Sequence, residues 1–306
     1  MLSTDLDLSS LSANERKEAE DSAQIIHALA MKALLHRLDP KAFPASGDAG
    51  SPEAEVIKLV QTLKSKPLAK LRPLIENRRD QAVEFSRVIK AAGLKLNGLA
   101  QNNQEEDHPM SGDIQISSFN RVNLVVRALH CLDETNPEIG SDDMILAGVL
   151  IGASGNTNIA HTIIRGGFDD GERVEFQSPQ RDFGSFSLTS TPSYPKSFFA
   201  IFKLHESDGD DADVAAGLEF MLRLYSQAAR AQHQSAPLSI RAFRVANSTQ
   251  AALNLWYSPP AFSPCGIVLN LNSQNQFGGA QSGNLRTGNI RGHGGTYRIG
   301  YKWRLS

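Results

Sequence analysis

Short apolar segments separated by turn residues recur along the middle of the chain, and this spacing restricts the fold more than any other feature. The segments are residues 114–119, 122–132, 144–151, 159–164, 174–176, 183–188 and 198–204. Runs of this kind at intervals of ~10 residues are typical of the strands of an antiparallel sandwich or barrel. We therefore predict a mostly β region that begins near residue 113.

A further group of segments continues this pattern to the C-terminus with one interruption. Strands are expected at residues 238–245, 252–257, 267–271 and 296–305. A helix at about residues 214–234 interrupts them, because Leu218, Met221, Leu222 and Tyr225 recur at helical spacing. The chain is therefore predicted to be an α+β protein whose antiparallel β-sandwich contains one inserted helix.

The last segment indicates how its strand lies in the sandwich. Tyr297, Ile299, Tyr301, Trp303 and Leu305 alternate with Arg298, Lys302 and Arg304. Because successive side chains of a strand point to opposite faces, one face of this strand is aromatic and apolar and the other is cationic. The preceding residues 277–295 are rich in Gly, Asn, Gln and Ser, which predicts a long polar loop.

The first third of the chain has helical spacing instead. Ser12 and Glu15 are separated as in a capping box, ahead of a helix at about residues 13–37. Ser51 followed by Pro52 begins a second helix, and a third is expected after Pro73. Residues 97–112 have the composition of a linker. We predict a helical bundle domain at residues 1–96, a linker at 97–112 and a mostly β domain at 113–306.

Composition limits the expected partners and compartment. The formal net charge of -2 gives the chain no overall positive field, so nucleic acid is not expected as a partner. Cys131 and Cys265 are too far apart and too few for a disulfide scaffold; we interpret them as two buried thiols, with a single bridge between them as the alternative. The N-terminus lacks a signal-peptide pattern, and no apolar run reaches the ~20 residues of a membrane span. The expected location of this soluble chain is the cytoplasm, or outside the cell after export without a cleavable signal peptide.

Three acidic loops each follow a predicted strand, and they form the candidate binding site. Ca²⁺ takes ~6–8 oxygen ligands, often carboxylates from loops that a rigid scaffold brings together. The candidate ligands are Asp133, Asn136, Asp142 and Asp143 in the first loop, Asp169 and Asp170 in the second, and Glu206, Asp208 and Asp213 in the third. Ordinary solvated turns are the alternative interpretation, because Asp, Asn, Gly and Ser dominate turns for backbone reasons.

Two of these loops resemble parts of the C2 domain, a calcium-dependent lipid-binding β-sandwich. Residues 140–144, Gly-Ser-Asp-Asp-Met, stand where this family has a Gly-x-Ser-Asp-Pro-Tyr run, and Glu206 and Asp208 stand where it has Asp-x-Asp. The resemblance covers about residues 122–213 and implies a C2-like sandwich whose loops hold Ca²⁺. The chain departs from the family pattern at Asn136 and Glu206, in the missing Pro-Tyr, and in the helix after the third loop.

Motifs of common enzymes are absent from the sequence. The chain has no Gly-x-Ser-x-Gly elbow, no Gly-x-x-x-x-Gly-Lys-Ser/Thr loop and no His-Glu-x-x-His. His130 and Cys131 are adjacent, but neighbours in a strand point to opposite faces and cannot act together. His205, beside the third acidic loop, is interpreted as a partly exposed polar residue. A binding protein is therefore favoured over an enzyme, and no catalytic residue is assigned.

The preferred function is a non-enzymatic binding or assembly protein that presents acidic loops, with Ca²⁺ as the candidate ligand. A protein partner or self-assembly is expected, and a membrane surface is an alternative. Two other functions stay open. A toxin or effector would rearrange its helices and its glycine-rich segment to act on membranes or on a target cell. A self-assembling structural subunit would use its C-terminal strand to complete the sheet of a neighbour.

Overall fold

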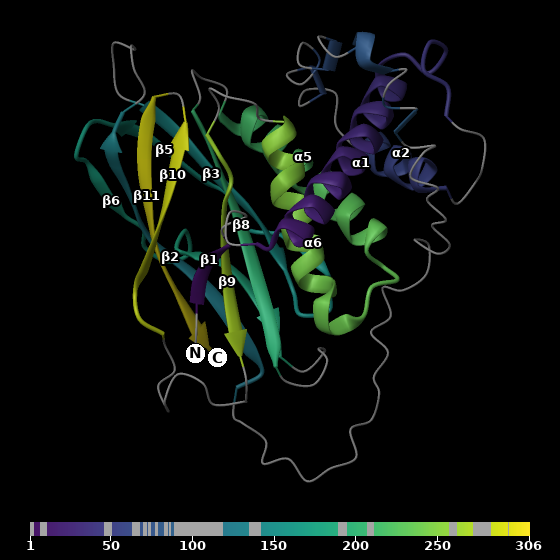
Figure 1. The fold of residues 1–306 in the computed structure, drawn as a ribbon. Coiled ribbons are helices and arrows are strands. Elements are labelled where there is room, and N and C mark those ends of the chain that lie inside the picture. Colours follow the sequence, from purple (N-terminus) through teal and green to yellow (C-terminus); the bar gives the residue numbers. More distant parts are fainter. Residues whose placement is uncertain are drawn as a thin grey trace.

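The architecture is that of a β-sandwich with helices packed on one side (Figure 1). The computed structural model describes residues 3–6, 11–45, 51–62, 119–134, 142–188, 195–206, 211–256, 262–271, 283–292 and 294–306, together with scattered residues between 68 and 88. Within these residues the chain is an α+β protein with two antiparallel sheets and an N-terminal helical region, as predicted. No helix of the described residues is long and apolar enough to cross a membrane.

The two sheets are called sheet A and sheet B. Sheet A has the order β1-β9-β8-β3-β4, with β5 also paired to β3. Its strands are β1 (Ser3–Leu6), β3 (Asp142–Ile151), β4 (Thr157–Ile159), β5 (Ile163–Phe168), β8 (Lys196–Glu206) and β9 (Cys265–Leu271). Sheet B has the order β10-β11-β2-β6, with β7 also paired to β2. Its strands are β2 (Arg121–Asp133), β6 (Arg173–Glu175), β7 (Asp182–Ser187), β10 (Arg286–Gly292) and β11 (Gly295–Leu305).

The core of the sandwich lies between the two sheets and confirms the predicted alternation of the last strand. Tyr297, Ile299, Tyr301 and Trp303 of β11 are all buried in this core, while Arg304 is exposed on the opposite face of the strand.

Two glycines allow the sheets to approach each other closely. A Cβ at Gly148 would lie 2.7 Å from Cε1 of Phe183, and a Cβ at Gly184 would collide with the side chain of Leu150. Side chains at these two positions would therefore push the sheets apart.

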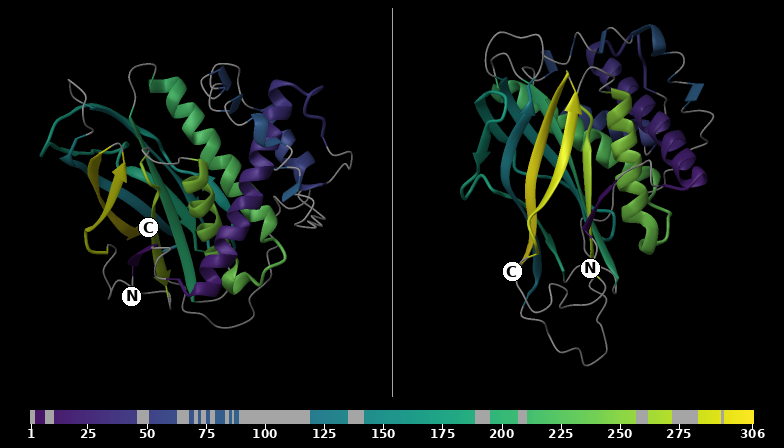
Figure 2. Two further views of the ribbon diagram at one scale, coloured as in Figure 1. Left: turned by 45° about the horizontal axis from the view of Figure 1, so that its top comes forward. Right: turned by 60° about the vertical axis from the view of Figure 1, so that its left-hand side comes forward.

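The helices cover the other face of sheet A. α5 (Asp211–Gln232) and α6 (Leu238–Trp256) lie on β3 and β8, and α1 (Ala13–Leu38) packs on both of these helices. α2 (Pro52–Gln61) in turn packs on α1 and α5. Two further views show all of these helices on one side of the sandwich (Figure 2). Sheet A is thus buried on both faces, which explains why β3 is almost continuously apolar in sequence.

The first two predicted helices are confirmed with their starts. Ser12 caps α1, and its capping box with Glu15 is complete. Ser51 caps α2 ahead of Pro52. A buried ion pair of 2.8 Å between Nζ of Lys32 and Oε1 of Glu53 joins the two helices. The third predicted helix, after Pro73, lies largely outside the described residues, although buried Ile75 and Phe85 belong to the helical core.

The predicted strands at residues 238–245 and 252–257 are wrong, because both segments belong to α6. The region therefore inserts two helices, and the predicted helix at about 214–234 corresponds to α5. Ala242, Val245, Ala246, Ala252 and Leu253 are all buried in the helical core. Their spacing follows a helical turn, and the alternation of Leu238, Ser239 and Ile240 at the start of α6 obscures it.

The predicted polar loop at residues 277–295 is also corrected, because it contains β10. This strand forms a hairpin with β11 and buries only Ile290 and Gly288, which leaves the rest of its side chains polar. β11 in turn lies between β10 and β2, so both of its edges are hydrogen-bonded within the chain. The C-terminal strand is therefore not a free edge that could complete the sheet of a neighbour.

The helical and β parts of the chain share one packed unit. α1 and α2 belong to the same hydrophobic cluster as α5, α6 and the helix-facing side of sheet A. The N-terminus also contributes β1, which pairs antiparallel with β9 at the edge of sheet A. The expected linker at residues 97–112 and all but the last residue of the strand expected at 114–119 lie outside the described residues.

Candidate functional site at the loop end of the sandwich

The strand ends that flank the three acidic loops lie at one end of the sandwich, at the top in Figure 1. Asp142 pairs with Phe168 at the start of β3, which places the strand after the first loop beside the start of the second loop. Met144 pairs with Glu206, which places the end of β8 and the start of the third loop next to the same strand. Strand pairing thus brings together chain segments that are more than sixty residues apart in sequence. We call this region the loop end.

Several carboxylates of the loop end already accept hydrogen bonds from the backbone. The N–H of Glu134 donates to Oδ1 of Asp170 at 2.6 Å, and the N–H of Gly167 donates to Oδ1 of Asp143 at 3.1 Å. The backbone of Cys131 also pairs with the second loop, through Gly171 and Glu172. These bonds hold the two ends of the first loop, at Glu134 and Asp143, against the second loop. They also use some of the oxygens that a cation would need.

The structure describes only some of the predicted metal ligands. Asp133, Asp143, Asp169, Asp170, Glu206 and Asp213 belong to the described part of the chain, whereas Asn136, Asp208 and the side chain of Asp142 do not. Among the described side chains, no group of three or more His, Cys, Asp or Glu residues is placed to hold a metal ion. An all-oxygen donor set fits Ca²⁺ by its chemistry, and completing it would require the undescribed residues.

The histidines near this end are not arranged for catalysis with Cys131. Cys131 is buried in the core between the sheets, and His130 is half-buried on the outer face of sheet B. His205 is half-buried on β8, opposite Ile145. Both cysteines remain thiols, although Cys131 and Cys265 belong to facing sheets.

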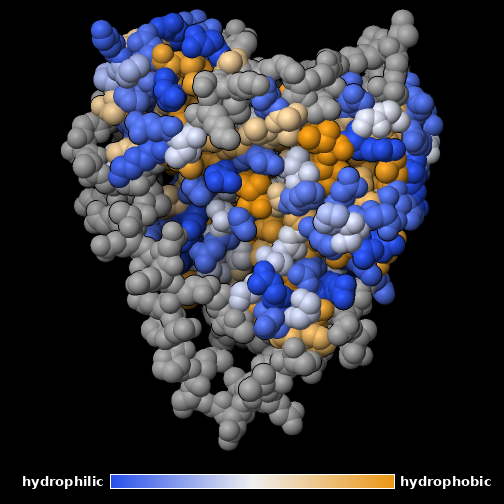
Figure 3. Space-filling model, turned by 180° about the vertical axis from the view of Figure 1, so that it is seen from behind, coloured by the Kyte–Doolittle hydropathy of each residue, from blue (hydrophilic) through white to orange (hydrophobic). Residues whose placement is uncertain are grey.

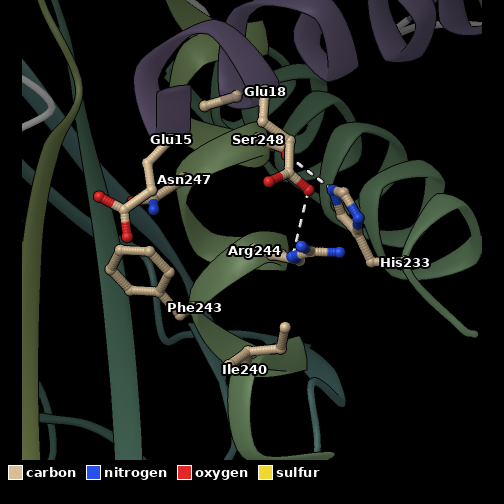
Figure 4. A pocket seen from close by; sticks show the side chains of 9 residues that line it. Glu15, Glu18, His233, Ile240, Phe243, Arg244, Asn247 and Ser248 are labelled. Atoms are coloured by element: carbon tan, nitrogen blue, oxygen red, sulfur yellow. Dashed lines mark hydrogen bonds and ion pairs between the residues drawn. The ribbon is translucent and has the colours of Figure 1, made fainter. Parts of the chain in front are cut away.

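A separate small cavity lies on the helical side of the molecule, between the start of α1 and α6 (Figure 4). Its volume is about 120 Å³. Pockets for small-molecule ligands usually have ~300–1,000 Å³, so this cavity is too small for most substrates. Its walls are mostly apolar, with Ile240 and Phe243 among the lining residues, and Glu15 and Glu18 from α1 face Arg244 and Asn247 from α6. Sequence reasoning missed this cavity because it depends on the unpredicted helix α6.

Two polar contacts span this cavity, and both are drawn in Figure 4. The guanidinium Nε of Arg244 lies 3.1 Å from Oε1 of Glu18, and Nε2 of His233 is hydrogen-bonded to Oγ of Ser248 at 2.8 Å. His233 and Ser248 are almost fully buried, so the pair holds α5 against α6. Burial of the imidazole, with a smaller effect of the nearby charge of Arg244, lowers the pKa of His233 to about 4.

This low pKa of His233 predicts a loss of stability in mild acid. As the pH falls from about 6.5 to about 4, the unfolded chain takes up a proton on this residue and the folded chain does not. The free energy of unfolding should therefore fall over this window by an amount on the order of 3 kcal/mol. Urea denaturation followed by circular dichroism at closely spaced pH values measures this slope.

His233→Gln is the matched variant, because a glutamine can still bond to Ser248 but does not titrate. The difference in unfolding free energy between the native chain and H233Q should shrink as the pH falls from neutral to about 4. The contributions of the other histidines to the unfolding free energy are the same in both proteins and cancel in this difference. Parallel curves for the two proteins would contradict the assignment of the acid sensitivity to His233.

Comparisons with known proteins give no guide to this chain, because no protein-family model, no curated protein and no solved structure matches it. The candidate sites are therefore defined by their geometry and chemistry alone.

Proposed function

We propose that this chain is a non-enzymatic binding protein that uses the loop end of the sandwich as its binding site, with Ca²⁺ as the candidate ligand. The observation that carries this proposal is the meeting, at one end of a rigid scaffold, of the strand ends that flank the three acidic loops. Binding residues commonly lie on loops that a sheet framework positions, as in other antiparallel sandwiches. A C2-like mode of binding belongs to the same proposal and is supported by the two-sheet architecture.

The site would draw on each of the three loops. Asp133 and Asp143 border the first loop, Asp169 and Asp170 form the tip of the second, and Glu206 ends the strand before the third. Asp213 lies in the first turn of α5, directly after the third loop. Asn136, Asp142 and Asp208 would complete the set of oxygen ligands. The backbone hydrogen bonds of Asp143 and Asp170 would preorganise the two loops before binding.

Calcium titration of the full chain tests this proposal. Saturation with Ca²⁺ at about a hundred times its Kd should raise the free energy of unfolding by ~2.7 kcal/mol, because only the folded chain assembles the three loops. Isothermal titration calorimetry and thermal melts with and without calcium measure the effect. Mg²⁺ serves as the competing ion, since it demands a tighter octahedral site.

Variants of the undescribed ligands sharpen the calcium test. Asp142→Asn combined with Asp208→Asn should abolish the calcium-induced rise in melting temperature and leave the calcium-free melting temperature nearly unchanged. Glu175→Gln, on the outer face of sheet B, is the matched control and should keep the full rise. Absence of heat and of a melting shift at millimolar calcium would contradict a cation site at the loop end.

A further inference from the structure

The outer face of sheet B carries an excess of positive side chains. Six of them come from three neighbouring strands: Arg121 and Arg127 of β2, Arg291 of β10, and Arg298, Lys302 and Arg304 of β11. The register places Arg298 opposite His130 and Arg304 opposite Asn123. These side chains therefore share the face that points away from the sandwich core. We call this set the cationic face.

Acidic side chains do not neutralise the cationic face within the described part of the chain. None of the six cationic side chains forms an ion pair with a described residue, and two of them donate hydrogen bonds to neutral partners. The Nε of Arg298 donates to Oδ1 of Asn289 at 3.2 Å, and Arg121 donates to Oγ of Ser185. Glu175 of β6 and Asp182 of β7 are acidic residues on neighbouring strands of the same sheet, and both already have partners: Glu175 is paired with Arg173 at 2.9 Å, and Asp182 accepts a hydrogen bond from Ser178 at 2.7 Å. The cationic face is thus available for an anionic partner.

The chemistry of the cationic face narrows the class of partner. Tyr297, Tyr301 and Trp303 point into the core, so the face has no aromatic platform on which bases of a single-stranded nucleic acid could stack. The strands of sheet B carry no exposed large apolar side chain among the described residues; Leu285, just before β10, is the one at their border, and a single such residue is too little to insert into a bilayer. Arginine predominates, and its planar guanidinium pairs best with carboxylates or phosphates.

The same chain also exposes a surface of opposite charge, which consists of carboxylates. The turn at residues 169–172 joins β5 to β6 and exposes the side chains of Asp169 and Asp170 at the loop end. Hydrogen bonds hold this acidic turn rigid, including those from the N–H of Glu172 to the carbonyl of Asp169 and from the N–H of Gly171 to that of Cys131. Gly171 has open space around its Cα. In the view from behind, hydrophilic side chains crowd the rim of the sandwich on the right (Figure 3).

We propose that the acidic turn of one copy of this chain docks on the cationic face of a second copy. The inference rests on the proposed function, since it names the partner of the loop end as another copy of the chain. The two surfaces are rigid and opposite in charge, and a net charge of only -2 leaves little overall repulsion between copies. Because the acidic turn and the cationic face are different surfaces, the contact is heterologous, and its repetition builds a ring or an open filament according to the rotation between copies.

Sedimentation velocity of the full chain, with a chelator present, tests this association. The sedimentation coefficient should rise with protein concentration at ~0.02 M salt and stay at the monomer value at ~0.5 M salt, where the Debye length falls to a few ångströms. Strictly monomeric behaviour at millimolar protein in low salt overturns the proposal. So does a monomeric chain that instead binds heparin, RNA or anionic vesicles through the cationic face.

A charge swap makes the test independent of folding defects. The face variant Arg298→Glu with Arg304→Glu, and the turn variant Asp169→Lys with Glu172→Lys, should each be monomeric alone with an unchanged far-ultraviolet spectrum. Mixing the two should restore association, because the face variant keeps its acidic turn and the turn variant keeps its cationic face. Failure of the mixture to associate overturns the proposal even if both variants are folded.

The two proposals can fail separately. A chain that binds calcium but stays monomeric keeps the loop end as a cation site and removes the second copy as its partner. A chain that associates in chelator but gives no calcium heat keeps the assembly contact and removes the cation. The chelator in the sedimentation buffers keeps these two readouts apart.

Discussion

Replacing Trp303 with alanine is expected to destabilise the fold by about 3–5 kcal/mol, the largest effect of any substitution considered for this chain. Trp303 is 1% exposed and lies between the two sheets, where its ring is 6.0 Å from that of Phe186. Alanine would leave a cavity that the rigid sheets cannot close, because β11 is paired on both edges. Urea denaturation followed by circular dichroism measures the loss.

Two further variants separate packing from polarity at this position. The indole Nε1 of Trp303 is buried and has no hydrogen-bond partner among the described residues, which carries a penalty of ~1–3 kcal/mol. Trp303→Phe removes this unpaired N–H and keeps most of the ring, so it should lose less than ~1.5 kcal/mol. Arg304→Ala, on the outer face of the same strand, should change stability by less than ~0.5 kcal/mol. Equal losses for Trp303→Ala and Trp303→Phe would contradict this account.

Local patterns in the sequence were sufficient to place most elements of the fold. The spacing of Ser12 and Glu15 identified the start of α1, because a capping box is a contact between residues three apart. The alternation along β11 predicted which of its side chains are buried, because it depends only on the geometry of one strand. Features of this kind need no knowledge of the rest of the chain.

Elements whose character depends on distant partners were not predicted. α6 was interpreted as two strands, because its apolar residues contact both sheet A and α1 and so leave no clean amphipathic stripe. β10 was interpreted as a loop, because an edge strand with one buried side chain has the composition of a loop. β1 gives no signal in sequence, since four residues become a strand only when paired with β9.

In the candidate sites, too, local sequence predicts some features and strand pairing determines the others. The acidic loops were recognised from composition, and strand pairing in the structure adds that the strand ends flanking them lie at one end of the sandwich. Half of the cationic face was predicted from β11 alone. The contribution of Arg291 required the β10–β11 hairpin, which the sequence did not reveal. Those of Arg121 and Arg127 required the pairing of β11 with β2, a strand more than a hundred positions away. Non-local pairing thus limits what the sequence alone reveals about a surface.

Replacing Lys203 with methionine is expected to stabilise the fold at neutral pH. The Lys203 side chain is fully buried on the helix-facing side of β8, where its ammonium donates to the carbonyl oxygen of Phe262. Burial lowers its pKa from 10.5 to about 7. Keeping this group in the folded chain at pH 7 therefore opposes folding, and methionine of similar length removes the penalty. We expect a net gain on the order of 2 kcal/mol, since losing the bond to Phe262 offsets part of it.

The pH dependence of this gain identifies its cause. Between about pH 7 and 10.5 the unfolded chain holds a proton on Lys203 that the folded chain releases, so the native protein gains stability as the pH rises. The advantage of Lys203→Met should accordingly be largest near or below pH 7 and shrink towards pH 10.5. Lys302→Met makes the same exchange at a half-buried lysine on the outer face of sheet B, and it should show no such trend. A gain for Lys203→Met that is constant across this pH range would mean that shape, and not the buried charge, determines the stability at this position.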